Sequence, residues 1–264
     1  MTKDRLPITN YQLPITIIYF LSGFTALLYQ VVWQRMLGLF SGSDVRSVTI
    51  VVASYLLGLG VGWLGGWVSD RLSSRQAVQI YSCCNFGIAI FAVCSRFLFY
   101  DLLFLQGKSL AQSTTVMLAI VFVSLLIPTT LMGVSLPLVS KATSRHAAGA
   151  AARIGLLYGL NTLGSGLGTL VSGWYIIGTF GYEKTVYLGA VLSALVGIIA
   201  WSSSRQFDAA RSLPTVMPIA KLPQRSRLVW QWCLLVFISG FAAISLEIIW
   251  FRILDTILQS IAYT

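Results

Sequence analysis

Residues 20–37 read FLSGFTALLYQVVWQRML, and residues 237–254 read FISGFAAISLEIIWFRIL. The two stretches match without a gap at eight of eighteen positions, at a constant separation of 217 residues. Aliphatic matches arise easily between membrane helices, whereas two Phe, a Trp and an Arg in register do not. Each stretch lies in an apolar run of the length that a bilayer-crossing helix needs, about 20 residues. The pair therefore predicts a helical membrane protein with an internal repeat.

The composition places the chain in the same class. Of the 264 residues, 56% are hydrophobic and only 10% are charged, whereas a soluble domain carries roughly 25% charged residues. So few charges cannot cover a water-facing surface, and lipid must surround much of the chain. The net charge of +10 is explained by Lys and Arg in short loops. The sequence predicts an all-α polytopic transmembrane bundle, with the lipid bilayer and no nucleic acid as its partner.

Seven apolar stretches are long enough to span the membrane. They cover residues 14–39, 47–68, 77–100, 114–140, 151–180, 185–202 and 228–254. With a cytoplasmic N-terminus, twelve Lys and Arg residues lie on inside segments and six on outside segments. Because inside loops carry the excess of basic residues, the N-terminus is predicted to be cytoplasmic.

The repeat and one linker divide the chain. Residues 1–202 are predicted to form a six-helix transmembrane half, and residues 203–227 a basic cytoplasmic linker with three prolines. Residues 228–264 then hold the copy of the first helix. We expect them to be the first helix of an incomplete second half, in a truncated form or a fragment of a protein with about twelve helices.

Glycines spaced by four mark two predicted helices. Small residues at this spacing let another backbone pack closely, and the candidates are Gly58, Gly62, Gly155, Gly159, Gly164 and Gly168. The two helices hold corresponding places if the first half is built as three helices plus three. Residues 164–168, GSGLG, look like a nucleotide-binding loop, but no strand precedes them. The four cysteines match no metal-site spacing, and neither a cofactor nor a metal is expected.

Polar residues inside the apolar stretches are the candidates for function, because charge in lipid is costly. Glu247 is the one clear acid in a predicted helix, and Gln30 is its repeat partner. These two residues and Asn161 either line a cavity for a cation or proton, or make local hydrogen bonds between helices. Trp33 beside Arg35, like its repeat copy, is interpreted as an anchor at the membrane interface.

Residues 66–75 read GWVSDRLSSR and follow the second predicted helix. They resemble the cytoplasmic loop motif of major facilitator transporters, which is carried here by Gly66, Asp70, Arg71 and Arg75. Asp70 can form a polar lock between helices by pairing with a basic residue or with helix N-terminal amides. Two serines, at 73 and 74, replace the family's Gly and Arg. The alternative is an ordinary basic inside loop.

The paired helices, together with PTTLMGVSLP at 128–137 and LYGLNTLG at 157–164, resemble the membrane part of bacterial fused major-facilitator/spermidine-synthase proteins. Such proteins carry a following aminopropyltransferase domain, whose glycine-rich strand-turn-helix has no counterpart here. No catalytic residue carries over, and the chain is not expected to be an enzyme.

The resemblance implies a transporter-like module of the cell membrane that handles polyamines or other organic cations. Its expected partners are the missing half of the bundle or an aminopropyltransferase domain. Two alternatives stay open: a non-transporting membrane anchor of an aminopropyltransferase, and a truncated remnant. Uptake that depends on Glu247 separates a transporter from an anchor.

Overall fold

The computed structural model describes residues 12–41, 45–99, 114–143, 150–207 and 226–258, and all regular elements in these ranges are helical. The helices are α1 (Gln12–Ser41), α2 (Val45–Trp63), α3 (Gly66–Ser69), α4 (Ser74–Arg96), α5 (Thr114–Thr143), α6 (Ala150–Val171), α7 (Ile177–Ser203) and α8 (Ser226–Leu258). A π-helical turn, Ser172–Ile176, joins α6 to α7, and a 3-10 turn, Ser204–Phe207, follows α7. The predicted all-α class is confirmed.

The chain forms two compact units, Met1–Leu213 and Pro214–Thr264. The first unit holds α1 to α7, and the second holds α8. The division falls within the stretch 203–227 that the sequence marks as a linker.

Six described stretches are long and apolar enough to cross a membrane: Pro14–Leu37, Thr49–Ser69, Ser74–Phe99, Ala119–Thr143, Ala152–Ser203 and Trp230–Trp250. The stretch Ala152–Ser203 has 52 residues, over twice the roughly 20 that one crossing takes. Gly181 breaks it with φ 75° and ψ 174°, a left-handed backbone that favours glycine. The chain therefore turns between α6 and the long part of α7. The protein is a multi-pass helical membrane protein.

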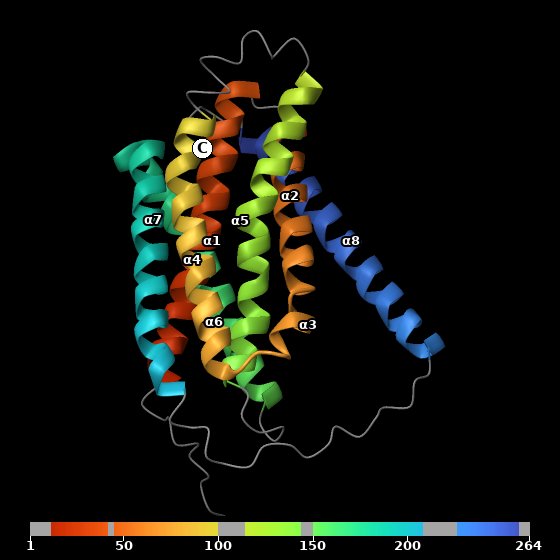
Figure 1. The fold of residues 1–264 in the computed structure, drawn as a ribbon. Coiled ribbons are helices and arrows are strands. Elements are labelled where there is room, and N and C mark those ends of the chain that lie inside the picture. The colour runs from red at the N-terminus through yellow and green to blue at the C-terminus, as the bar shows by residue number, and fades with distance from the viewer. Residues whose placement is uncertain (1–11, 42–44, 100–113, 144–149, 208–225, 259–264) are drawn as a thin grey trace, which may run out of the picture. The chain divides into compact units, whose positions relative to one another are not determined.

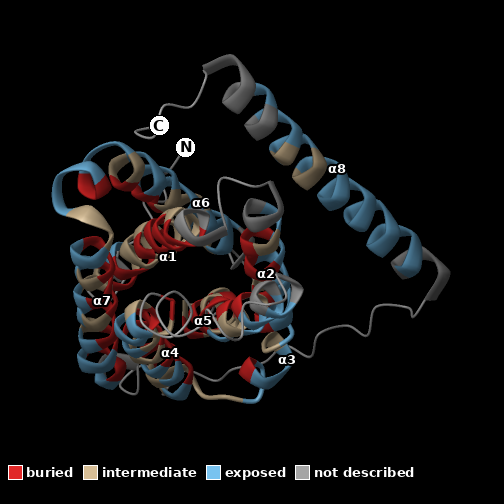
Figure 2. Ribbon diagram, turned by 90° about the horizontal axis from the view of Figure 1, so that it is seen from above, coloured by how far each residue is buried: buried red, intermediate tan, exposed pale blue. Residues whose placement is uncertain are grey.

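The long helices of the first unit run alternately up and down (Figure 1). α2 packs on α5, α1 on α6 and α4 on α7, and these pairs are joined through contacts of α4 with α5 and of α1 with α7. Figure 2 shows the buried residues on the sides of the helices that face one another. The outward sides are exposed, as lipid-facing sides of a membrane bundle are.

Trp33 is fully buried in an apolar cluster that joins residues of α1, α2, α4, α5 and α7. Its indole Nε1–H donates to Ser95 Oγ at 3.0 Å, and its ring stacks on Tyr29 with centroids 5.1 Å apart. Phe91 meets it edge-on at 5.6 Å. The interpretation of Trp33 as an interface anchor is wrong. Since its only polar group is satisfied by a serine inside the bundle, the ring need not reach the polar headgroups.

The α2–α5 crossing brings two backbones into direct contact. A Cβ built on Gly62 would lie 2.7 Å from both Gly133 Cα and Val134 N, and would collide with the carbonyl oxygen of Thr130. In return, a Cβ built on Gly133 would collide with the carbonyl oxygen of Leu59. Only glycine fits at either position, because no side chain can enter such a contact.

The α1–α6 crossing repeats this arrangement. A Cβ on Gly164 would collide with the carbonyl oxygen of Phe20 and lie 3.2 Å from Phe24 N. A Cβ on Gly23 would collide with the carbonyl oxygen of Asn161. In both crossings, the Cβ built on each glycine collides with the carbonyl oxygen of the residue three positions before the partner glycine.

The two crossings relate the first three passes to the next three. Gly133 of α5 takes the place of Gly23 of α1, and Gly164 of α6 takes the place of Gly62 of α2. If α4 likewise corresponds to α7, the contact of α4 with α5 corresponds to the contact of α7 with α1, and both contacts are present. Hereafter α1, α2 and α4 are the first triplet, and α5, α6 and α7 the second. Because each triplet has an odd number of passes, the second is inverted with respect to the first.

Candidate functional site

The loop motif lies where the second pass ends in a tight turn. α2 stops at Trp63, and Gly65 N–H donates to the carbonyl of Gly62 at 2.9 Å before the short helix α3 begins. Ser69 Oγ donates back to Gly66 O at 2.8 Å and closes α3. The sequence predicted one uninterrupted stretch through residue 68. The break is explained by the adjacent glycines at 65 and 66, which weaken a helix.

Ser73 starts the next helix. Gln76 N–H donates to Ser73 Oγ at 3.2 Å, and Ser73 N–H donates to Gln76 Oε1 at 2.9 Å. This reciprocal pair is a capping box, which satisfies two backbone donors at the start of α4. In the sequence analysis, Ser73 was noted only because it differs from the Gly of the major-facilitator loop motif. The Ser-x-x-Gln spacing was the signal that would have found its role.

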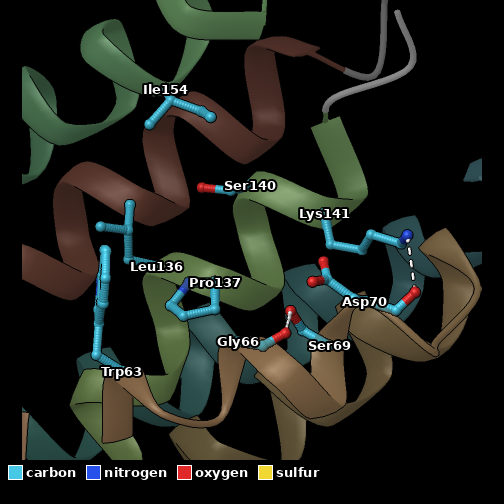
Figure 3. A pocket seen from close by; sticks show the side chains of 9 residues that line it. All are labelled: Trp63, Gly66, Ser69, Asp70, Leu136, Pro137, Ser140, Lys141 and Ile154. Atoms are coloured by element: carbon cyan, nitrogen blue, oxygen red, sulfur yellow. Dashed lines mark hydrogen bonds between the residues drawn. The ribbon is translucent and has the colours of Figure 1, made fainter. Parts of the chain in front are cut away.

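A cavity of about 460 Å³ opens beside this loop, between the α2–α3 turn, the end of α5 and the start of α6 (Figure 3). Its wall is apolar on one side and polar on the other. The lining residues are Trp63, Gly66, Ser69, Asp70, Leu136, Pro137, Ser140, Lys141 and Ile154. It brings together a carboxylate, an ammonium group and hydroxyls over an apolar floor, which suits a small amphipathic or zwitterionic group.

Lys141 links two of the elements that line this cavity. Its Nζ donates to the backbone carbonyl of Asp70 at 3.1 Å, which joins the end of α5 to the loop before α4. Figure 3 shows this bond, with the Asp70 side chain also lining the cavity. The bond uses the main chain of Asp70, whereas the predicted lock between helices was a contact of its carboxylate, which stays a prediction. The sequence did not single out Lys141 for this role, although basic residues near a helix C-terminus often bind carbonyls.

The other basic residues at this end also have defined contacts. The guanidinium of Arg71 lies 4.2 Å from the ring centroid of Trp67, a cation–π contact. Arg75 lies in the first turn of α4 and is half-buried. Arg153 Nη1 donates to the carbonyl of Thr143 at 3.3 Å, which links the start of α6 to the end of α5. The loop motif residues therefore gather at the end of the bundle where α2 and α5 end.

The three candidate substrate residues lie on three different helices, two in the first unit and one in the second. Gln30 and Asn161 are half-buried on α1 and α6, whereas Glu247 is exposed on α8 in the second unit. The main chain of Asn161 meets Gly23, and its Oδ1 would lie 2.8 Å from a Cβ there. Asn161 therefore takes part in the α1–α6 crossing.

The six glycines chosen for packing divide into two groups. Gly58, Gly62, Gly164 and Gly168 each touch a neighbouring helix, and a Cβ on Gly58 would lie 2.6 Å from Thr129 Cβ. A Cβ on Gly155 or Gly159 would meet no atom within 4 Å, which differs from the prediction for these two. Each precedes its counterpart in the second pair by nine residues, or about two and a half turns. The two pairs therefore face opposite sides of α6.

The buried polar side chains of the described bundle are hydroxyls and one amide, Asn85, and none carries a charge. Most bond to their own helix, as Asn85 Nδ2 does to the carbonyl of Tyr81 at 2.9 Å. In the described ranges no group of three or more His, Cys, Asp or Glu residues could hold a metal. An ion pair between Arg96 and Glu183, 3.2 Å apart and half exposed, joins α4 to α7.

The described part of this unit thus contains an amphipathic cavity and the two glycine crossings of α2 with α5 and of α1 with α6. No protein-family model, curated protein or solved structure matches the chain.

Proposed function

We propose that this chain is a transporter-like module, built as the six-helix half of a major-facilitator-like transporter with one further helix. The duplicated glycine crossing carries the proposal. Gly23 against Asn161 and Gly133 against Leu59 relate two triplets of opposite orientation. Inverted repeats of this kind are a building principle of secondary transporters, whose two faces open alternately.

The proposed substrate class is polyamines or other organic cations, in a protein related to spermidine synthases. The resemblance of the paired helices and of residues 128–137 and 157–164 supports this class. Glu247 is the acid that would meet the cation, since an acid in a membrane helix is costly and is retained for a function. Gln30, at the same place in α1, is its proposed partner in recognition.

The proposed location is the cell membrane with the N-terminus in the cytoplasm. Arg71, Lys141 and Arg153 lie at the end of the bundle where α2 and α5 end and α4 and α6 begin. Positive residues concentrate on the cytoplasmic side of membrane proteins. This end would therefore face the cytoplasm, as would the N-terminus of α1.

A second candidate is a membrane anchor for an aminopropyltransferase that transports nothing. The uncharged character of the buried polar side chains in the described bundle favours it. An anchor needs close helix packing but no charged group along a substrate path. The two candidates differ in whether the acid of α8 has a ligand.

Thermal unfolding of the purified chain in detergent, with spermidine or putrescine added, separates the candidates. A transporter module is stabilised in a saturable way, because a ligand bound only to the folded state raises its stability. Glu247→Gln should abolish the shift. Glu183→Gln, which removes an acid of the α4–α7 ion pair, is the matched control and should keep it.

Radiolabelled polyamine uptake into proteoliposomes is the second measurement. Uptake that is lost in Glu247→Gln and kept in Glu183→Gln supports transport. A folded sample with neither a thermal shift nor uptake overturns the transport proposal in favour of the anchor.

A further inference from the structure

The repeated helices α1 and α8 share eight of eighteen aligned residues, and several of these residues have different surroundings in the two helices. In α1, Gly23 is buried against α6. In α8, a Cβ on the equivalent Gly240 would meet nothing within 4 Å. Its neighbours Phe237 and Phe241 are 70% and 67% exposed. This face of α8, which we name the Gly240 face, consists of Phe237, Gly240 and Phe241.

The packing of α1 against α6 shows which kind of helix surface such a face fits. Gly164 and Gly168 of α6 admit the carbonyl oxygens of Phe20 and Phe24, while Gly23 admits that of Asn161. Successive residues of α6 meet successive residues of α1 in the same order, so the two helices run parallel. In this packing, the single glycine of α1 and the Gly-x-x-x-Gly pair of α6 each allow close contact with the backbone of the other helix.

A hydrogen bond also joins α1 to α6. Ser165 Oγ of α6 donates to the carbonyl of Gly23 at 3.2 Å. Ser165 lies between the two glycines of the pair, so the partner helix supplies a hydroxyl as well as a flat surface. Glycine at position 23 leaves this carbonyl open to the approach, because no side chain of α1 stands beside it.

Trp250 of α8 also differs in burial from its copy in α1. Trp33 of α1 is buried and bonded to Ser95, whereas its copy Trp250 is 60% exposed. Burying an indole is favourable only when its N–H has an acceptor. The Gly240 face and Trp250 thus repeat, in order along the helix, the two features through which α1 is held.

We infer that the Gly240 face binds a parallel transmembrane helix of the α6 kind, with a Gly-x-x-x-Gly pair and a hydroxyl residue between its glycines. The α6 pair itself is covered by α1, so the partner is another helix with the same features. This inference concerns helix recognition and holds for either a transporter module or an anchor.

A peptide of residues 150–176, which contains α6, is the probe. The peptide carries an acceptor fluorophore, and the full-length chain carries a donor on a C-terminal tag, both in lipid vesicles. We expect saturable energy transfer. Gly240→Leu should weaken binding by about tenfold or more, because the added side chain holds the backbones apart. A peptide with Leu at both 164 and 168 should not bind.

Ser245→Leu is the matched control. It adds the same side chain to the same helix, but α1 already has Leu28 at this repeat position. This variant should bind the peptide as the wild type does. Circular dichroism establishes that each variant keeps its helix content.

Transfer that is the same in Gly240→Leu, or absent in a fully helical wild-type sample, overturns the inference. Energy transfer between two differently labelled copies of the full-length chain, lost in Gly240→Leu, would instead identify a second copy as the partner of this face and would also overturn the inference.

Discussion

The backbone carbonyl of Asn161 occupies the place where Gly23 would carry a side chain, and the carbonyl of Leu59 does the same to Gly133. Two helix pairs far apart in the sequence are thus held by one arrangement of backbone atoms. This relationship makes stability depend on a few glycines, while other glycines of the same helices are free to change.

Gly62→Leu should strongly destabilise the bundle. The new side chain would meet Gly133 Cα and the carbonyl of Thr130, and α2 and α5 would have to separate. We expect a loss of about 3 kcal/mol in the free energy of unfolding, at the upper end of the cost of overpacking. Denaturant titration in mixed micelles measures it.

Gly60→Leu is the control for this prediction, since a Cβ there meets nothing within 4 Å. It lies on the same helix, two residues away, and should leave the unfolding free energy nearly unchanged. Equal losses in both variants would mean that helix insertion and not the crossing was affected.

The two glycine pairs of α6 should respond in opposite directions to alanine. Gly164→Ala places a methyl group against the carbonyl of Phe20 and should cost about 1–3 kcal/mol. Gly155→Ala meets no atom and should gain about 0.5–1 kcal/mol, because alanine loses less entropy in a helix. Thermal unfolding of both variants in one detergent gives the signs. A loss in Gly155→Ala would show that this face is covered in the assembled protein.

Ser95→Ala should destabilise the core by leaving the indole N–H of Trp33 without its acceptor. A buried donor without a partner costs about 1–3 kcal/mol, whereas hydrogen bonds between membrane helices average only about 0.6 kcal/mol. We expect a value near 1 kcal/mol. A double-mutant cycle with Trp33→Phe isolates the bond, and a coupling energy of zero would contradict its contribution.

Ser73→Ala should weaken the start of α4 by about 1 kcal/mol, the usual cost of losing an N-cap hydroxyl. Ser74→Ala removes a neighbouring hydroxyl and leaves the capping box intact, so it should have little effect. Hydrogen exchange at the first amides of α4 reports the difference locally. Equal exchange rates in the two variants would show that the cap contributes nothing.

Most of the helical layout is predictable from the sequence because length and apolarity alone define a membrane pass. The expected gap between residues 180 and 185 falls beside Gly181, where the backbone turns. The stop at Trp63 was missed, since the apolar run continues through the turn. A hydropathy pattern does not register a break that leaves both sides in lipid.

Side-chain placement was harder to predict for a physical reason. In a soluble helix the polar face marks the outside, but a membrane helix is apolar on all sides. Nothing in the sequence around Trp33 therefore indicates that it is buried. The choice between the two faces of α6 was available, because nine residues between Gly155 and Gly164 put them on opposite sides.

The cavity residues were predictable only in part. Asp70 and Gly66 follow from the loop motif, whereas Lys141 lies 71 residues further on and acts through a main-chain oxygen. Such a partner is found only when the ends of α3 and α5 are known to meet.

Both glycine crossings join a helix of the first triplet to a helix of the second, and neither joins helices within a triplet. Lys141 fastens the triplets together at one end, and the Arg96–Glu183 pair does so at the other. Sliding one triplet past the other would drive backbone into backbone, since packed interfaces do not deform continuously. The six passes of the first unit are therefore held as one rigid body, and any displacement of one triplet carries the other with it.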